Sequence, residues 1–75
     1  MSKDHTQNTA SLPPHVRQLK GMLAERGLRQ NDVADWLGIS QAAVSRRMSG
    51  EVDFRWAELS VIAQRLGVPE LGRVA

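Results

Sequence analysis

The sequence predicts a small all-α protein, and three observations support this fold class. In three segments, apolar residues recur at spacings of three and four, as they do on a helix with one buried face. Four candidate helices each end at or just before a glycine, which suits the left-handed residue that terminates a helix. Two of these helices are short and are separated only by residues 38–40. The glycines are Gly27, Gly38, Gly50 and Gly67.

Length and composition narrow the class further. A chain of 75 residues holds one domain at most and lies near the lower size limit for an unaided hydrophobic core. Without cysteine, it forms no disulfide and no thiolate metal site, so helix packing must supply its stability. No apolar run approaches the roughly 20 residues of a membrane span, and the N-terminus lacks the apolar stretch of a secretory signal. We therefore expect a cytoplasmic protein without a membrane partner.

The first helix follows a polar N-terminal stretch. Residues 1–12 show no periodicity and predict a disordered arm, so the folded domain is expected to cover 13–75. Pro13–Pro14 marks the start of the helix, because proline is tolerated in the first turn. The apolar residues that follow at helical spacing are Val16, Leu19, Met22 and Leu23, and Gly27 ends the helix.

The second and third predicted helices are short. The second covers about residues 30–37, with Trp36 beside its buried stripe, and it stops at Gly38. The third starts after Ser40, whose hydroxyl suits an N-cap, and it runs to about Ser49. The buried stripe of the second helix consists of Val33, Ala34 and Leu37.

A fourth helix is expected over about residues 55–66, after a loop at 51–54. Gly67 and Pro69 end it, and the remaining residues either add one turn or fray. Its apolar face is expected to contain Trp56, Leu59, Ile62, Ala63 and Leu66. We expect Phe54 and Trp56 to close the core; the alternative is a patch for a second copy or for a ligand.

The two short helices and their turn have the layout of a helix-turn-helix, which places its second helix in the major groove of DNA. Such helices cross closely, and Ala34 supplies the small residue at the crossing. Gly38, four residues later, adopts the positive φ of the turn without a Cβ penalty. The apolar residues expected to fill the space between the helices and the core are Val33, Leu37, Ile39 and Val44.

The positions of the charged residues support this layout more strongly than the net charge does. Ten Lys and Arg against eight Asp and Glu give a net charge of only +2. However, Arg46, Arg47 and Arg55 lie in or just after the third helix, and such clustering is the electrostatic footprint of a nucleic-acid site.

Together with the segment IAQRLGV, the stretch GLRQNDVADWLGISQAAVSRRMSG resembles the Cro/CI (XRE-type) helix-turn-helix family over about residues 15–68. This family includes the lambda and 434 repressor DNA-binding domains. The resemblance implies a compact four- to five-helix lambda-repressor-like fold. It also implies a transcriptional regulator of the phage or prophage Cro-like or repressor type. Its partner would be a double-stranded DNA operator, in a bacterial or phage-infected host cell.

The resemblance also assigns roles to residues. Gln30 would bind a phosphate and brace Gln41. The residues facing base edges would be Gln41, Ala42, Ser45 and Arg46, and their chemistry fits, since Gln pairs with adenine, Arg with guanine, and the Ala methyl meets the thymine methyl. The further contacts to the DNA backbone would be Arg29, Ser40, Arg47, Ser49 and Arg55.

Two departures from the family pattern matter. Arg29 stands where the family usually has Ser or Thr, so a helix cap worth about 1 kcal/mol is lost. Arg47 stands where the family often has an apolar residue, and Met48 is expected to take over its packing through a small rotation of the helix. Whether Arg46 or Arg47 meets a base is therefore left open.

Other functions find less support. His5 and His15 lack a third ligand at suitable spacing, so no metal is expected. Asp32 and Asp35 are expected to be exposed, with Asp32 favouring the positive end of its helix. No catalytic set or phosphate-binding glycine loop is present, so we expect no enzyme, no cofactor and no small-molecule substrate.

The alternative function is a protein-binding adaptor or antitoxin-like module with the same fold. A homodimer on DNA and a monomer both remain open, because residues 68–75 are short for a dimer interface.

Overall fold

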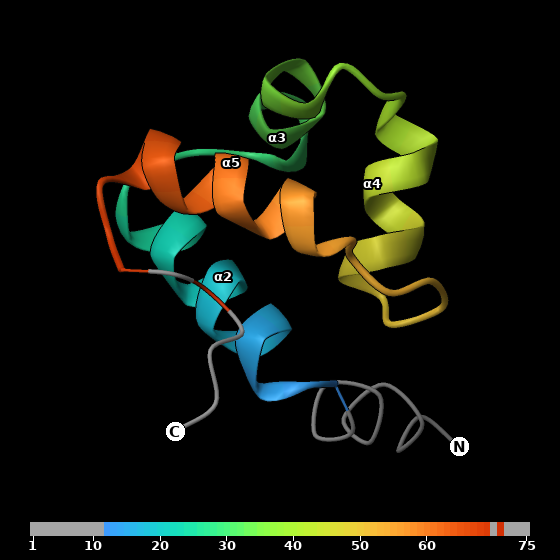
Figure 1. Cartoon of the computed structure of the whole chain (residues 1–75), viewed down its shortest axis with the longest axis horizontal. Coiled ribbons are helices and arrows are strands. Elements are labelled where there is room, and N and C mark those ends of the chain that lie inside the picture. Colours follow the sequence, from blue (N-terminus) through green and yellow to red (C-terminus); the bar gives the residue numbers. More distant parts are fainter. Residues whose placement is uncertain (1–11, 70, 72–75) are drawn as a thin grey trace.

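The chain is all-α in the computed structural model, which describes residues 12–69 and 71. This part of the chain forms four helices and no strand (Figure 1). The helices are α2 (Pro14–Glu25), α3 (Gln30–Leu37), α4 (Gln41–Met48) and α5 (Trp56–Leu66). The fold class and the helix ends therefore agree with expectation to about one residue, while residues 1–11 of the expected arm lie outside the described residues.

Two of the helices begin with the same unusual cap. The backbone N–H of Arg29 donates to Asp32 Oδ2 at 2.8 Å, and that of Arg55 donates to Glu58 Oε1 at 2.9 Å. An arginine side chain has no acceptor, so only the acidic residue three positions later can close the first turn. Its negative charge then lies at the positive end of the helix. The cap expected to be lost at Arg29 is thus partly replaced by Asp32.

The core is a single cluster to which every described helix contributes. Its members are Leu12, Val16, Leu19, Leu23, Val33, Ala34, Val44, Met48, Phe54, Leu59, Ile62, Ala63, Leu66 and Leu71. No polar side chain is buried among the described residues. Leu12 belongs to this core, so the folded domain begins at least one residue before the expected boundary at 12/13.

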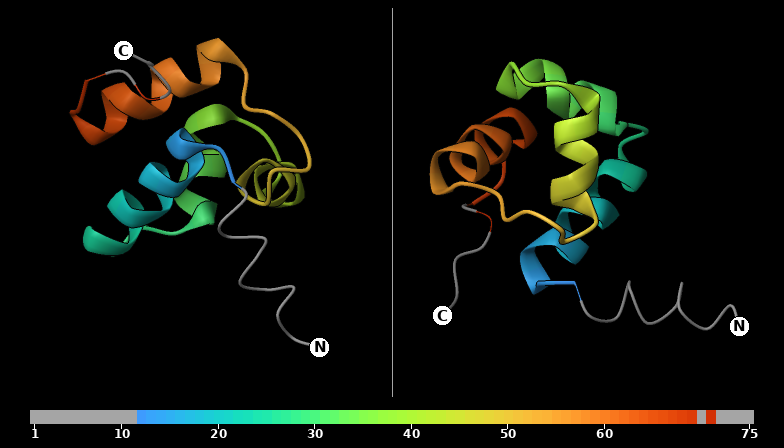
Figure 2. Two further views of the ribbon diagram at one scale, coloured as in Figure 1. Left: turned by 90° about the horizontal axis from the view of Figure 1, so that it is seen from below. Right: turned by 90° about the vertical axis from the view of Figure 1, so that its right-hand side faces the viewer.

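The helices are arranged so that α4 lies at the edge of the domain. Helix α3 packs against both α4 and α5, and α2 closes the core through Val16, Leu19 and Leu23. In the right-hand view of Figure 2, α4 faces the viewer and neither α2 nor α5 covers it. The outer side of α4 is therefore available to a ligand.

The aromatic residues separate into two groups. Trp36 is half-buried and packs against the core, and Phe54 is buried within it, both as expected. Trp56 is 62% exposed, so its expected place in the core is wrong. It is the first residue of α5, and we attribute its exposure to this position, because side chains on a helix tilt toward the N-terminus.

Candidate nucleic-acid interface

The turn between α3 and α4 has the geometry expected of a helix-turn-helix. Gly38 adopts a left-handed conformation with φ 69° and ψ 32°. Its N–H donates to the Ala34 carbonyl at 2.8 Å, and the N–H of Ile39 donates to the same oxygen at 3.2 Å. These bonds close α3 and reverse the chain within the turn. The role expected of Gly38 is confirmed, since L-residues rarely adopt this conformation.

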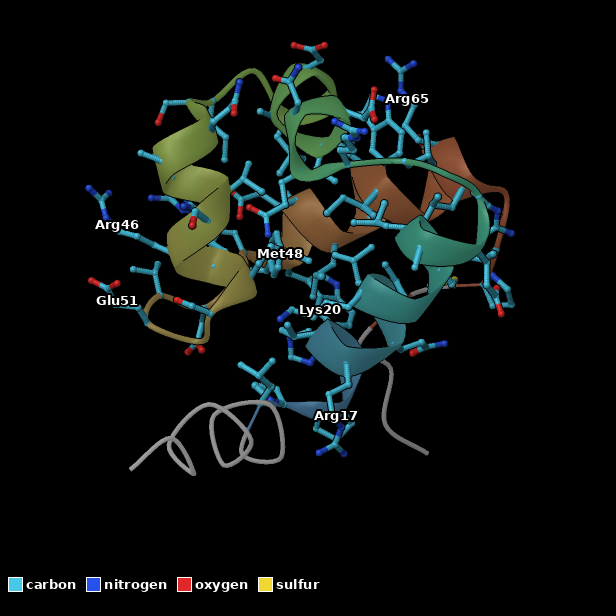
Figure 3. All side chains as sticks on the ribbon, turned by 180° about the vertical axis from the view of Figure 1, so that it is seen from behind. Arg17, Lys20, Arg46, Met48, Glu51 and Arg65 are labelled. Atoms are coloured by element: carbon cyan, nitrogen blue, oxygen red, sulfur yellow. The ribbon has the colours of Figure 1, made fainter. Side chains whose placement is uncertain are left out.

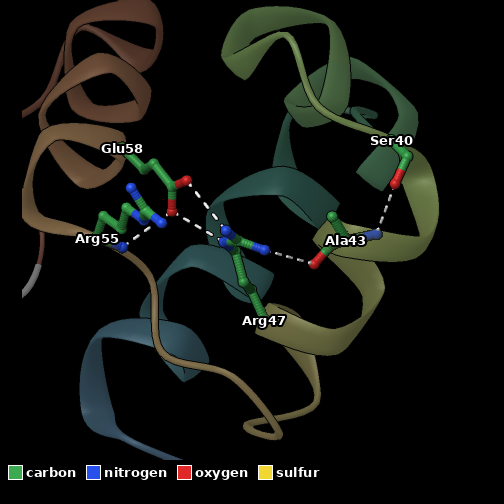
Figure 4. Close-up of polar contacts among 5 residues, drawn as sticks. All are labelled: Ser40, Ala43, Arg47, Arg55 and Glu58. Carbon is green, nitrogen blue, oxygen red and sulfur yellow. Dashed lines mark hydrogen bonds and ion pairs between the residues drawn. The ribbon is translucent and has the colours of Figure 1, made fainter.

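Helix α4 begins at a capped end. The Ser40 hydroxyl oxygen accepts a hydrogen bond from the Ala43 N–H at 3.0 Å, which confirms Ser40 as the N-cap (Figure 4). Because the hydroxyl acts here as an acceptor, its own proton stays free for another acceptor.

The rotation of α4 about its axis decides which residues face outward. Val44 and Met48 are buried, while Ala43 and Arg47 are half-buried. Met48 thus takes the packing position expected of it. The exposed residues are Gln41, Ala42, Ser45, Arg46 and Ser49, whose spacings of three and four place them on one face. We call these five residues the outer face of α4. It contains all four residues expected to read bases, and Figure 3 shows Arg46 pointing away from the domain.

A side-chain hydrogen bond joins the first turns of α3 and α4. Gln41 Nε2 donates to Asn31 Oδ1 at 2.8 Å. The family resemblance implies that Gln30 braces Gln41, so this partner is corrected to Asn31, its neighbour in α3. Both carry an exposed amide at the start of the same helix, and sequence spacing alone did not distinguish them.

The side chain of Arg47 lies between α4 and α5 rather than on the outer face of α4. Its Nε donates to Glu58 Oε1 at 2.9 Å and its Nη2 to Glu58 Oε2 at 3.2 Å. Its Nη1 donates to the Ala43 carbonyl, one turn earlier in α4, at 3.1 Å (Figure 4). The side chains of Arg47 and Glu58 are only 14% and 15% exposed. The structure therefore separates the two neighbouring arginines that the sequence left equivalent.

The environment of Glu58 keeps this pair ionised. Partial burial raises the pKa of the Glu58 carboxyl. The hydrogen bonds from Arg47 and from the Arg55 amide, together with the positive charges of both arginines, lower it by more. The pKa therefore lies below its ordinary value of 4.5. Glu58 was not singled out from the sequence, although its position three residues after the helix start at Arg55 was a usable signal.

The other residues expected at the DNA backbone lie at helix ends. Arg29 and Gln30 are exposed at the start of α3, and Arg55 is exposed at the start of α5. Ser49 is exposed at the end of α4, where its hydroxyl donates to the Arg46 carbonyl at 2.9 Å. Helix ends present free backbone groups beside these side chains, which suits contacts to phosphate.

Residues 12–69 and 71 contain neither a metal-binding cluster nor a membrane-spanning helix. No group of three or more His, Cys, Asp or Glu side chains in this part is placed to hold a metal ion. None of its helices has both the length and the apolar character that crossing a membrane requires.

The fold and the α3–turn–α4 geometry define a helix-turn-helix domain of the DNA-binding class. The chain belongs to a helix-turn-helix domain family, whose model matches residues 16–74. This is a family of XRE-like domains and agrees with the Cro/CI resemblance; its members are typically non-enzymatic. No curated protein and no solved structure matches the chain closely enough to count as a relative.

Proposed function

We propose that the protein is a sequence-specific double-stranded DNA-binding transcriptional regulator of the phage or prophage Cro-like or repressor type. It would act in the cytoplasm of a bacterium or an infected host and insert α4 into the major groove. One observation carries the proposal: the outer face of α4 presents four residues suited to base edges, while buried Val44 and Met48 anchor the opposite side.

The chemistry of the outer face fits base recognition. Arg46 reads guanine through two donors, and the Ala42 methyl meets a thymine methyl. Gln41 reads adenine through one amide proton and its carbonyl oxygen. The bond to Asn31 uses the other amide proton, so it orients Gln41 without blocking it. Each good bidentate pair discriminates against the wrong base by about 1–3 kcal/mol.

The remaining contacts would be to phosphates, which position a protein on the duplex. The residues proposed for them are Gln30, Arg29, Ser40 and Arg55, together with Ser49 if its hydroxyl proton leaves the Arg46 carbonyl to which it is donated in the free protein. Ser40 still has a free hydroxyl proton for this purpose. Arg47 is not among them, because three of its five N–H donors are bound within the domain and its side chain is only 14% exposed. A homodimer would place two copies of α4 about 34–36 Å apart on a near-palindromic operator, whereas a monomer would read a single half-site.

A second candidate function rests on a different observation. The two large apolar side chains exposed in the described residues are Val52 and Trp56, at 39% and 62%. Both lie at or before the start of α5 rather than on α4, and tryptophan is common at the centre of protein interfaces. This observation favours a protein-binding adaptor or antitoxin-like module that keeps the fold.

A salt titration separates the two functions. For DNA binding, the affinity for a random-sequence duplex falls with salt, with a slope of log K against log salt near −0.9 per phosphate neutralised. Arg55→Gln should make that slope less steep by about 0.9, whereas Arg65→Gln, at the far end of α5, should leave it unchanged. No duplex binding at low salt, or binding insensitive to salt, would overturn the proposed function.

A further inference from the structure

The side chains of the two neighbouring arginines of α4 point in different directions. Consecutive residues on a helix are about 100° apart around its axis, since a turn contains 3.6 residues. Arg46 is exposed and points away from the domain (Figure 3). Arg47 points toward α5, and its side chain is 14% exposed (Figure 4). An orientation of α4 that brings Arg46 to a base edge therefore keeps Arg47 turned toward α5.

Arg47 is held to two helices at once. Its Nε and Nη2 face the two oxygens of Glu58, a paired arrangement that fixes the plane of the guanidinium. Its Nη1 donates to the Ala43 carbonyl of α4 itself. A guanidinium bound in this way cannot turn toward a phosphate without breaking hydrogen bonds on both sides.

The Glu58 carboxylate is in turn held by the backbone at the start of its own helix, α5. The carboxylate that accepts from Arg47 also accepts the backbone N–H of Arg55 at 2.9 Å, so it caps the first turn of α5. The chain of contacts therefore runs from the backbone of α5 through Glu58 and Arg47 to the backbone of α4.

We propose that Arg47 is a positioning residue: its ion pair with Glu58 sets the rotation of α4, and thus the base preference, without contact to DNA. Helix α4 has only eight residues, of which only Val44 and Met48 are buried. Burial of these two side chains fixes the rotation of α4 only coarsely, because the hydrophobic effect is non-directional, whereas the paired hydrogen bonds define an orientation. The inference rests on the proposed function, because it concerns how α4 meets bases.

The first test compares salt slopes. Arg47→Gln should weaken binding to the duplex selected by the wild-type protein by about fivefold and leave the slope of log K against log salt unchanged. Arg55→Gln, the phosphate-contact control, should make that slope less steep by about 0.9. If Arg47→Gln changes the slope by the same amount, Arg47 neutralises a phosphate and the inference is wrong.

The second test uses a double-mutant cycle on base preference. Glu58→Gln removes the charge but keeps an oxygen that can accept from the Arg55 amide, so the α5 cap is preserved. Arg47→Gln and Glu58→Gln should each flatten the preference at the positions that α4 reads. The double variant should flatten it no further than either single change, because both remove the same pair. Additive effects, or no effect of Glu58→Gln, would overturn the inference.

The controls separate a positioning role from loss of folding. All variants are compared at a temperature at which circular dichroism shows them folded. Glu51→Gln removes an exposed carboxylate from the loop after α4 and should leave the base preference as it is in the wild-type protein. If the wild-type protein binds no duplex, the proposed function fails. If it binds and Arg47→Gln keeps the full preference, only the inference on Arg47 fails.

Discussion

Gln41 and Asn31 form a hydrogen bond across the helix-turn-helix, with 2.8 Å between Gln41 Nε2 and Asn31 Oδ1. The bond ties the first residue of α4 to the second residue of α3. It restricts the rotation of a long side chain, which otherwise loses roughly 1.5–2 kcal/mol of conformational freedom when it is ordered. Part of this entropic cost of ordering the Gln41 side chain therefore falls on folding rather than on ligand binding.

This bond gives the first prediction. Asn31→Ala should lower affinity for the selected duplex by about threefold to tenfold and weaken the preference at the one base position read by Gln41. Gln30→Ala, one residue earlier, should weaken binding to all sequences alike, because Gln30 is proposed to contact a phosphate. Competition titrations with single-base variants of the duplex measure both effects. A uniform loss for Asn31→Ala would show that the bond does not serve base recognition.

The second prediction concerns the turn. Gly38→Ala should destabilise the domain by about 1–2 kcal/mol, because Gly38 has φ 69° and L-residues are strained there. Gly21→Ala is the matched control: Gly21 lies within α2, and an added Cβ would meet nothing within 4 Å. That change should stabilise the domain by about 0.5–1 kcal/mol. Urea unfolding measures both, and equal effects would contradict the assigned turn geometry.

The third prediction concerns the two tryptophans. Trp36→Ala should destabilise the domain by more than about 1 kcal/mol, because Trp36 packs against the core. Trp56→Ala should change the free energy of unfolding by less than about 0.5 kcal/mol, because its ring is 62% exposed. Urea unfolding followed by circular dichroism compares the two variants. A larger loss at Trp56 would place its ring against the core after all.

The fourth prediction follows from the Glu58 carboxyl, whose pKa is lowered in the folded protein. A lowered folded pKa means that the unfolded chain binds the proton more readily, so the contribution of this group is present above its unfolded pKa. That contribution should be lost as pH falls from about 4.5 through the lower folded value. Urea unfolding between pH 7 and pH 3 should show a smaller acid-induced loss for Glu58→Gln than for the wild-type protein. Glu51→Gln serves as the control and should follow the wild-type curve.

Much of the fold could be predicted because its signals are local. Proline at the start of α2 and the glycines after α3 and α5 mark helix ends through backbone geometry, and Ser40 marks the start of α4 through its side-chain cap. The exposed face of α4 was predictable for a similar reason. Once Val44 and Met48 are placed inside, the helical repeat places Arg46 outside.

The features that were not predicted depend on how the helices are placed relative to one another. Arg47 and Glu58 are eleven positions apart on different helices, and their pairing requires the crossing of α4 and α5. The choice of Asn31 over Gln30 depends on a rotation of α3 that sequence periodicity does not resolve. Trp56 fits the apolar spacing of α5, but it is the first residue of this helix, and its side chain is exposed there.

Selection of bound duplexes from a random pool tests whether the outer face of α4 reads DNA sequence. Wild-type and Arg46→Ala proteins are compared in parallel. We expect the wild-type protein to enrich one motif that contains a guanine, and Arg46→Ala to lose the preference at that position while keeping the others. The spacing of any repeat within the motif would also distinguish a dimer from a monomer. Absence of an enriched motif would show that the protein does not read DNA sequence, and an identical motif from Arg46→Ala would show that Arg46 does not read a base.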